Sequence, residues 1–162
     1  MEAMAKGLPL VLSGLVREKR IDGVAAMGGG RGTSVLRVGL EVLPLGMPKV
    51  LVTTMAGAGS KLLAGIKDTH LVDSVVDFSG LNDILRPVIA QAGAALAAMA
   101  AVPVQAPSSR PRVAATMFGQ TTPCVDACRK RLSREGYDLY PFHANGMGGP
   151  NMEALIDQGF FD

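Results

Sequence analysis

The chain has 162 residues, of which 48% are hydrophobic and 19% charged, a composition typical of a soluble globular protein and unlike that of disordered or fibrous chains. Its 16 Lys and Arg against 14 Asp and Glu give a formal net charge of +2 without a basic cluster, which argues against nucleic acid as a partner. Two cysteines without a secretory signal ahead of them are typical of a reducing compartment, so we expect a cytoplasmic protein.

The first segments alternate between helical and strand patterns. Residues 7–23 contain a short helix, in which Pro9 is tolerable only near the first turn. The apolar face of this helix consists of Leu8, Leu12, Leu15 and Val16. Apolar runs at 22–27 and 49–55 have the length of buried strands, and a helical pattern at 33–43 lies between them.

The middle of the chain predicts an extended run at 69–76 and a long helix at 81–100. Asn82 or Asp83 is expected in the first turn of that helix, and Pro87 must lie early in it. The overlapping stretch 88–104 is mostly alanine, contains Gln91 and Pro103, and is no longer than the shortest membrane spans. We therefore expect no membrane partner.

The last third repeats the pattern of strand and helix. Strands are expected at 112–119 and 137–144, and helices at 122–136 and 149–159. Cap and stop residues support both helices: Thr121 or Thr122, Pro123 and Gly136 for the first, and Pro150, Asn151 and Gly159 for the second.

Strands that alternate with helices predict an α/β fold with parallel sheets. The stretch from Pro103 to Pro111 is rich in Pro and Ser and predicts a linker at 104–110 between domains 1–103 and 111–162. We expect two Rossmann-like segments with glycine-rich strand-to-helix loops, each short of a full sheet. Such a chain is either a fragment or completes its sheets by association, for example as a homo-oligomer.

Four glycines fall within 28–32, between a predicted strand and a predicted helix. Such a loop brings backbone N–H groups to a phosphate, and the helix N-terminus adds partial positive charge. The loop is neither a Walker A sequence nor the dinucleotide fingerprint, because Thr33 replaces the last glycine of the latter. The alternative is a tight turn with Thr33 or Ser34 as N-cap.

A second glycine-rich loop favours the ligand-binding interpretation. Ligands of open α/β sheets bind beyond the carboxyl ends of the strands, where both loops must lie. The residues of this second anion loop are Gly119, Thr121, Thr122, His143, Gly146, Gly148 and Gly149. His143, at a strand end, is a candidate acid, base or phosphate partner, and its alternative role is to pack and orient the loop.

The segments GVAAMGGGRGTSVL, SVVDFSGLNDI, FGQTTPCV and FHANGMGGPNMEALI resemble the two-domain ATP-binding family named after the tomato mosaic virus resistance protein. The resemblance covers nearly the whole chain. It implies two Rossmann-like domains in a longer protein, of which this chain looks like the middle part, and a first domain that binds ATP. It implies no established reaction.

Transferred position by position, the resemblance places the nucleotide phosphates near Gly28, Gly29, Gly32 and Thr33, with Met55, Ala56 and Asp68 on neighbouring loops. Gly30 and Arg31 stand where the family has serine and glycine, and Arg31 either pairs with a phosphate or fills its space. An acidic residue that the family has near Gly59 is missing, which removes one candidate ligand of a magnesium ion bound with ATP.

Other reactive residues give weaker indications. Cys124 and Cys128 lack further ligands at any usual metal-site spacing, so we expect small core residues. Asp68, Asp73 and Asp77 are candidates for a cation, with loop and cap roles as the alternative.

Two functions remain open from the sequence. One is a nucleotide-binding part of a larger enzyme that acts on a small anionic substrate between two domains. The other is a non-catalytic regulatory or protein-binding module with the same fold. No nucleophile with a base, and no complete metal set, can be named.

Overall fold

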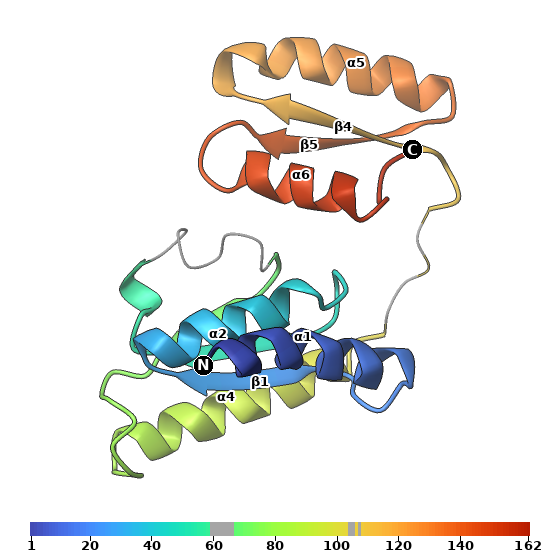
Figure 1. Cartoon of the computed structure of the whole chain (residues 1–162). Coiled ribbons are helices and arrows are strands. Elements are labelled where there is room, and N and C mark those ends of the chain that lie inside the picture. The colour runs from blue at the N-terminus through green and yellow to red at the C-terminus, as the bar shows by residue number, and fades with distance from the viewer. Residues whose placement is uncertain (59–66, 104–105, 107) are drawn as a thin grey trace. The chain divides into compact units, whose positions relative to one another are not determined.

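The structure is a computed structural model that describes residues 1–58, 67–103, 106 and 108–162. The chain divides into two compact units, Met1–Val104 and Gln105–Asp162, and each has its own parallel sheet (Figure 1). This arrangement confirms the α/β class predicted from the alternation of strands and helices.

The first unit has a three-stranded sheet. Its elements in chain order are α1 (Glu2–Arg17), β1 (Val24–Gly28), α2 (Gly30–Glu41), β2 (Lys49–Thr53), the 3-10 helix η1 (Ala56–Ala58), β3 (His70–Asp73) and α4 (Leu85–Ala100). The strands pair in the order β1-β2-β3, all parallel. The central strand β2 is buried at every position, which explains its unbroken apolar run from Val50 to Val52.

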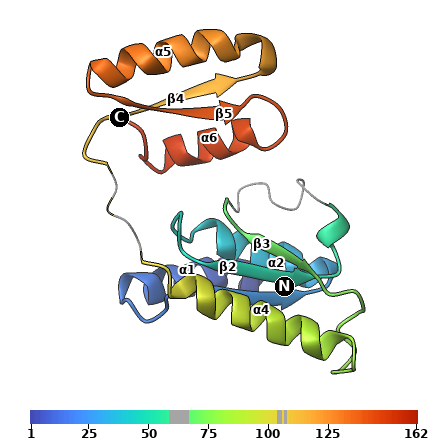
Figure 2. The same cartoon turned by 180° about the vertical axis from the view of Figure 1, so that it is seen from behind.

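Helices cover both faces of this sheet: α1 and α2 lie on one face and α4 on the other (Figures 1 and 2). The core on the first face consists of Leu12, Ala26, Leu40, Leu43 and Leu51. The core on the second face consists of Val50, Val52 and Ala92, with Val88 and Leu96 packed against it. Successive residues of β2 therefore alternate between the two cores.

Pro9 lies in the middle of α1, so the expectation that it sits near the first turn is wrong. The helix already begins at Glu2. A proline at this position cannot donate the backbone hydrogen bond that a helix interior requires. Packing of Leu8 and Leu12 against α2 and the sheet stabilises the helix despite that loss, because tertiary contacts dominate helix stability.

The second unit has a two-stranded parallel sheet with one helix on each face (Figure 1). Its elements are β4 (Arg112–Met117), the 3-10 helix η2 (Gly119–Thr121), α5 (Thr122–Arg134), β5 (Asp138–His143) and α6 (Gly148–Asp157). Aromatic rings make edge-on contacts beside β5 with centroids 5.2–5.9 Å apart: Tyr140, Phe142, Phe160 and Phe161. The Arg112 guanidinium lies 4.4 Å from the centroid of the Phe160 ring.

The expected helix ends are mostly confirmed. Gly136 and Gly159 follow α5 and α6 with φ of +90° and +67°, a conformation that favours glycine. Thr121 is the N-cap of α5, but its hydroxyl bonds to Phe118 and not to the helix. The last helix begins at Gly148, two residues before the expected Pro150.

Cys124 and Cys128 are exposed on α5, so the expectation of core residues is wrong. Cys124 and Cys128 lie one turn apart and are exposed, while Val125 between them is half-buried. Periodicity alone did not reveal the face, because Ala127 extends the apolar pattern to the exposed side.

Among the described residues, no helix has the length and apolar composition that a membrane crossing requires.

The contact between α1 and α2 depends on Gly39, and this gives the first testable prediction. A Cβ on Gly39 would lie 2.6 Å from Leu8 Cγ, whereas a Cβ on Gly14 of α1 would meet nothing within 4 Å. We expect Gly39→Ala to lower the free energy of unfolding by about 1–3 kcal/mol through overpacking. Gly14→Ala is the matched control and is expected to raise it by about 0.5–1 kcal/mol through helix propensity.

Chemical denaturation of both variants measures the two effects. Stabilisation of the chain by Gly39→Ala would contradict the close packing of α1 on α2.

Candidate functional site

The glycine segment forms the turn from β1 into α2. Gly28 is the last residue of β1, Gly29 is the N-cap of α2, and Gly30 is the first residue of the helix. A Cβ on Gly28 would lie 3.1 Å from both Gly32 C and Thr33 N, closer than side chains normally approach a backbone. Glycine at this position therefore allows the end of the strand to lie directly against the first turn of the helix.

A chain of hydroxyl groups holds this turn in place. The buried Thr33 hydroxyl donates to the Gly28 carbonyl at 2.9 Å and lies 2.7 Å from the Thr53 hydroxyl at the end of β2. Thr53 Oγ1 in turn accepts the N–H of Met55 at 3.0 Å. Since Thr33 has one proton and uses it on Gly28, Thr53 is the donor in the bond between the two hydroxyls.

These bonds correct the role expected for Thr33 and Ser34. Thr33 is 1% exposed and its hydroxyl is fully engaged inside the protein. The Ser34 hydroxyl donates to the Gly30 carbonyl at 3.1 Å, one turn earlier in the same helix. Neither side chain caps α2, because both hydroxyl protons are donated to backbone carbonyls of the glycine segment.

The first turn of α2 consequently presents backbone N–H groups. The first intrahelical bond is donated by Thr33 N to Gly29 O, so the N–H groups of Gly30, Arg31 and Gly32 precede the ladder. No side chain of the described residues caps this end, and no acidic residue lies in its first turn. A Cβ on Gly32 would meet nothing within 4 Å. This helix end is electropositive and sterically open.

The loops that follow β2 and β3 lie against this turn. Thr54 Oγ1 and Asp77 Oδ1 are 3.7 and 3.9 Å from the Cβ position of Gly29, and Met55 Sδ is 3.8 Å from that of Gly30. Ala56 begins η1 directly after Met55. The structure therefore brings together Gly28–Thr33, Met55 and Ala56 at the carboxyl edge of the first sheet, as parallel strands require.

Asp77 is the site residue that the family resemblance did not single out. Its carboxylate accepts the N–H of Phe78 at 2.8 Å and faces Gly29. The preceding turn contains Val75 at φ +65°, an unusual value for a β-branched residue, with its N–H bonded to Asp73. The sequence signal was the position of Asp77 directly after the extended run predicted at 69–76. In the described part of the chain, no three His, Cys, Asp or Glu side chains form a metal-binding group.

Asp68 does not lie at this edge, so its expected place beside the phosphates is wrong. Its carboxylate is 2.8 Å from Lys49 Nζ and accepts the N–H of Gly46 at 2.6 Å. Lys49 is the first residue of β2, so Asp68 lies at the amino edge, the opposite end of the sheet from Gly28. Asp68 precedes β3, whereas the residues that follow a strand reach the carboxyl edge.

Two lysines lie at that amino edge. Lys49 is 1% exposed, and its ammonium has three acceptors at 2.8 Å: Asp68 Oδ1 and the carbonyls of Pro44 and Met47. Burial lowers the pKa of Lys67, and the charge of Lys49 lowers it further. Asp68 thus has a structural role as the counter-ion of a buried lysine.

The second anion loop also gathers at one carboxyl edge, that of the sheet in the second unit. Gly119 and Thr121 belong to η2, Thr122 starts α5, His143 ends β5, and Gly146, Gly148 and Gly149 lead into α6. The exposed His143 ring lies 6.0 Å from the ring of Phe118, centroid to centroid. A Cβ on Gly148 would overlap the His143 backbone. Gly148 is therefore required by the turn itself.

Comparison with known proteins now identifies the family. Residues 1–105 match the model of the "Uncharacterised protein family (UPF0261) N-terminal domain", and residues 110–162 match the model of the corresponding C-terminal domain. The chain belongs to the UPF0261 family. The two-domain family inferred from the sequence motifs is thereby confirmed, and the family's own description assigns it no activity.

Curated UPF0261 relatives are similar over almost all of this chain. The ToMV resistance protein Tm-1(GCR237) of Solanum lycopersicum is 40% identical over 97% of the chain. UPF0261 proteins of Rhizobium meliloti and Clostridium tetani are 41% and 38% identical over 98% and 99% of it. The chain spans 22% of the tomato protein and 38% and 40% of the two bacterial proteins.

The hydroxyl chain gives a second prediction. Thr33→Val leaves the partly buried Gly28 carbonyl and the buried Thr53 hydroxyl without their partner, so we expect a loss of about 1–3 kcal/mol in the free energy of unfolding. Ser34→Ala removes an exposed hydroxyl one residue away and is expected to change it by less than about 0.5 kcal/mol. Urea denaturation compares the two, and equal losses would contradict the role of Thr33.

The second glycine loop gives a third prediction. Gly148→Ala is expected to unfold the second unit or to lower its melting temperature strongly, because the new Cβ overlaps the backbone of His143. Gly149→Ala adds the same methyl group where nothing lies within 4 Å and is the control. Calorimetry measures the melting temperatures of both variants. Equal melting temperatures of Gly148→Ala and Gly149→Ala would refute the requirement for glycine at position 148.

Proposed function

We propose that the carboxyl edge of the first sheet binds the phosphates of a nucleotide, with ATP as the ligand that the family resemblance implies. The observation that supports this most directly is the uncapped first turn of α2, which follows a glycine segment and has no acidic residue. An anion there accepts N–H bonds from Gly30, Arg31 and Gly32 and is attracted by the helix dipole.

Arg31 contributes mainly through its charge. It is exposed, and its side chain lines a hollow of about 280 Å³ with Met1, Glu2 and Ala5 on the α1 side of α2. Arg31 therefore lies on the side of α2 that faces α1, away from the loop of Thr54 and Met55. Exposed charge pairs contribute about 0.2–1 kcal/mol, so Arg31 is expected to assist binding rather than to determine it.

A magnesium ion fits the proposal through Asp77. A phosphate at the first turn of α2 would lie close to this carboxylate, and two negative groups without a cation between them repel each other. Magnesium is usually held by one or two carboxylates together with phosphate oxygens and water. Asp77 would supply the carboxylate, with the Thr54 hydroxyl beside it. The ion would neutralise phosphate charge.

For the whole protein we propose a larger, two-domain chain that binds a small anionic substrate. The first unit would be its nucleotide-binding part. The second anion loop is the candidate site for that substrate. Among the described residues no nucleophile is paired with a base, so the proposal assigns binding to these edges and no reaction. The tomato resistance and susceptible proteins are equally similar, at 40% identity, which gives no reason to propose an antiviral role.

Calorimetric titration with ATP and Mg²⁺ tests the site, with Gly32→Val as the decisive variant. The valine side chain enters the open space beside the exposed N–H groups, so we expect binding to be lost while the fold is retained. Gly93→Val in α4 is the matched control, because it also places a valine in a helix where nothing lies within 4 Å. Absence of binding to the folded parent chain at millimolar ATP would refute the proposal.

The role of Asp77 is tested by titrating ATP with and without Mg²⁺. We expect Mg²⁺ to strengthen binding about tenfold or more in the parent chain, as one charge-assisted contact of about 1.5–3 kcal/mol implies. Asp77→Asn is expected to remove this dependence and to bind metal-free ATP at least as tightly as the parent. Asp73→Asn, at the same edge, is the control. A magnesium effect that persists in Asp77→Asn would exclude Asp77 as the ligand.

A further inference from the structure

A second hollow lies in the first unit at the amino edge of the sheet, opposite the proposed phosphate site. Its volume is about 510 Å³, within the range of about 300–1,000 Å³ that is usual for small-molecule sites. It is bounded by the end of α1, the segment before β1, the 44–48 loop before β2 and the end of α4. An adjoining hollow of about 240 Å³ shares Met47, Pro48 and Met99 with it.

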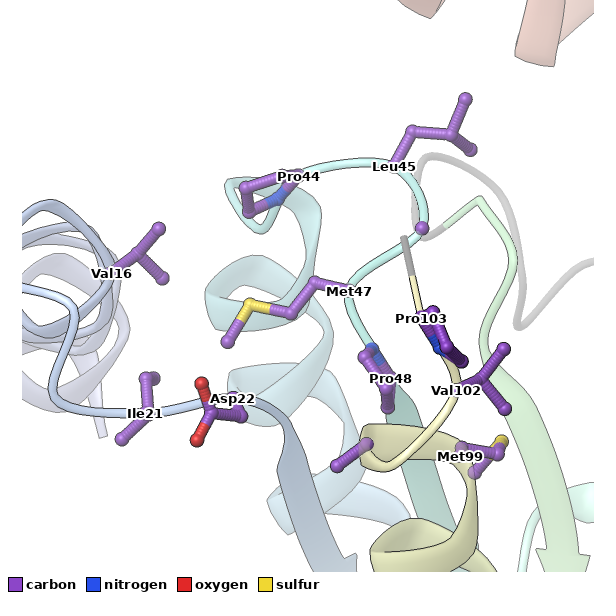
Figure 3. Close-up of a pocket in the computed structure, with 12 residues that line it drawn as sticks. Val16, Ile21, Asp22, Pro44, Leu45, Met47, Pro48, Met99, Val102 and Pro103 are labelled. Carbon is purple, nitrogen blue, oxygen red and sulfur yellow. The ribbon is translucent and has the colours of Figure 1, made fainter. Parts of the chain in front are cut away.

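The walls of this amino-edge hollow are almost entirely apolar. Figure 3 shows Val16 and Ile21 on one wall, Met47 and Pro48 in the middle, and Met99, Val102 and Pro103 on the other wall. Leu45 and Val102 also line the hollow and are 44% and 64% exposed. A ligand that fills the hollow therefore needs an apolar body.

One charged side chain faces this apolar surface. Of the described residues that line the hollow, Asp22 alone is ionisable, and it lies beside Ile21 (Figure 3). No hydrogen bond or ion pair of Asp22 occurs within the described part of the chain. Asp68 in the adjoining hollow differs, because Lys49 and the Gly46 N–H already engage its carboxylate.

The helices add negative potential at the same edge. The strands are parallel and the helices return antiparallel to them, so α1, α2 and α4 all end at the amino edge. The last turn of α4 contains no basic residue that would offset its C-terminal dipole, whereas Lys67 Nζ lies 3.5 Å from the Glu41 carbonyl at the end of α2, and Arg17 lies in the last turn of α1. Ala100, the last residue of α4, lines the hollow directly. Among the cations at this edge, Lys49 is buried and paired with the Asp68 carboxylate, and Arg20 is paired with Glu18.

We propose that the amino-edge hollow is a binding site for a small organic cation, a molecule with an apolar body and a protonated amine. The apolar walls cover the body, and the Asp22 carboxylate and the C-terminal end of α4 attract the ammonium group. The same features repel a carboxylate or phosphate, so this site and the phosphate edge select ligands of opposite charge. The proposal is independent of nucleotide binding.

The test uses three probes of equal chain length: octylammonium, octanol and octanoate. Methyl resonances of methionine in the whole chain report the location, because Met47 and Met99 line the hollow while Met117 and Met152 belong to the second unit. We expect octylammonium to shift Met47 and Met99 only. It should bind at least about threefold more tightly than octanol, and octanoate should bind more weakly than either, as one partly exposed charge pair predicts.

Two variants distinguish the contribution of the Asp22 charge to binding from that of the apolar hollow. Asp22→Asn is expected to reduce the affinity for octylammonium to that for octanol, whereas Asp157→Asn in the second unit leaves it unchanged. Ala100→Phe fills the hollow and is expected to abolish the shifts with all three probes. Equal binding of octanoate and octylammonium to the parent chain, an unchanged preference in Asp22→Asn, or the absence of shifts at Met47 and Met99 in the folded chain would each overturn the proposal.

Discussion

The contact between the end of β1 and the first turn of α2 determines what this protein presents at the carboxyl edge of its first sheet. Gly28 has no side chain, so its backbone lies directly against Gly32 and Thr33. The hydroxyls of Thr33 and Thr53 then join β1, α2, β2 and the Met55 turn through buried hydrogen bonds. Because these bonds fix the helix start from the inside, its N–H groups are left to face the outside.

The two edges of this sheet differ in electrostatic character because of the direction in which its strands and helices run. Parallel strands with returning helices place the N-terminus of α2 at the carboxyl edge and the C-termini of α1, α2 and α4 at the amino edge. The first turn of α2 has no acidic residue, and the last turn of α4 has no basic one, whereas Arg17 lies at the end of α1 and Lys67 at the end of α2. One sheet can therefore present an anion site and a cation site at opposite ends.

The sequence predicted the elements better than it predicted the direction of side chains. Buried strands such as β2 were evident because an unbroken apolar run of strand length between turn residues is typical of a strand buried on both faces. Pro9 was misplaced because propensity rules ignore the packing of Leu8 and Leu12 that sustains α1. The exposure of Cys124 and Cys128 escaped prediction because small residues such as Ala127 do not distinguish the faces of a helix.

The sequence predicted the position of the glycines of the proposed phosphate site. It did not single out the Asp77 carboxylate as the acidic group beside them. Gly28 to Gly32 are adjacent in sequence, so the turn and the helix start follow from local rules. The family resemblance placed Asp68 beside the phosphates, although the extended run predicted at 69–76 already put Asp68 before the strand and Asp77 after it, the order that β3 (His70–Asp73) has in the structure. The engagement of the Thr33 hydroxyl depends on Thr53, which comes from the neighbouring strand.

The most direct test of phosphate binding at α2 is an amide NMR titration of the whole chain with Mg·ATP and, separately, with inorganic pyrophosphate. Amide protons that donate to phosphate move downfield, and the account predicts this for Gly30, Arg31 and Gly32 with both ligands, together with changes around Thr54 and Asp77. A spectrum in which these three amides stay in place while saturating ligand perturbs other residues, or perturbs none, would contradict it.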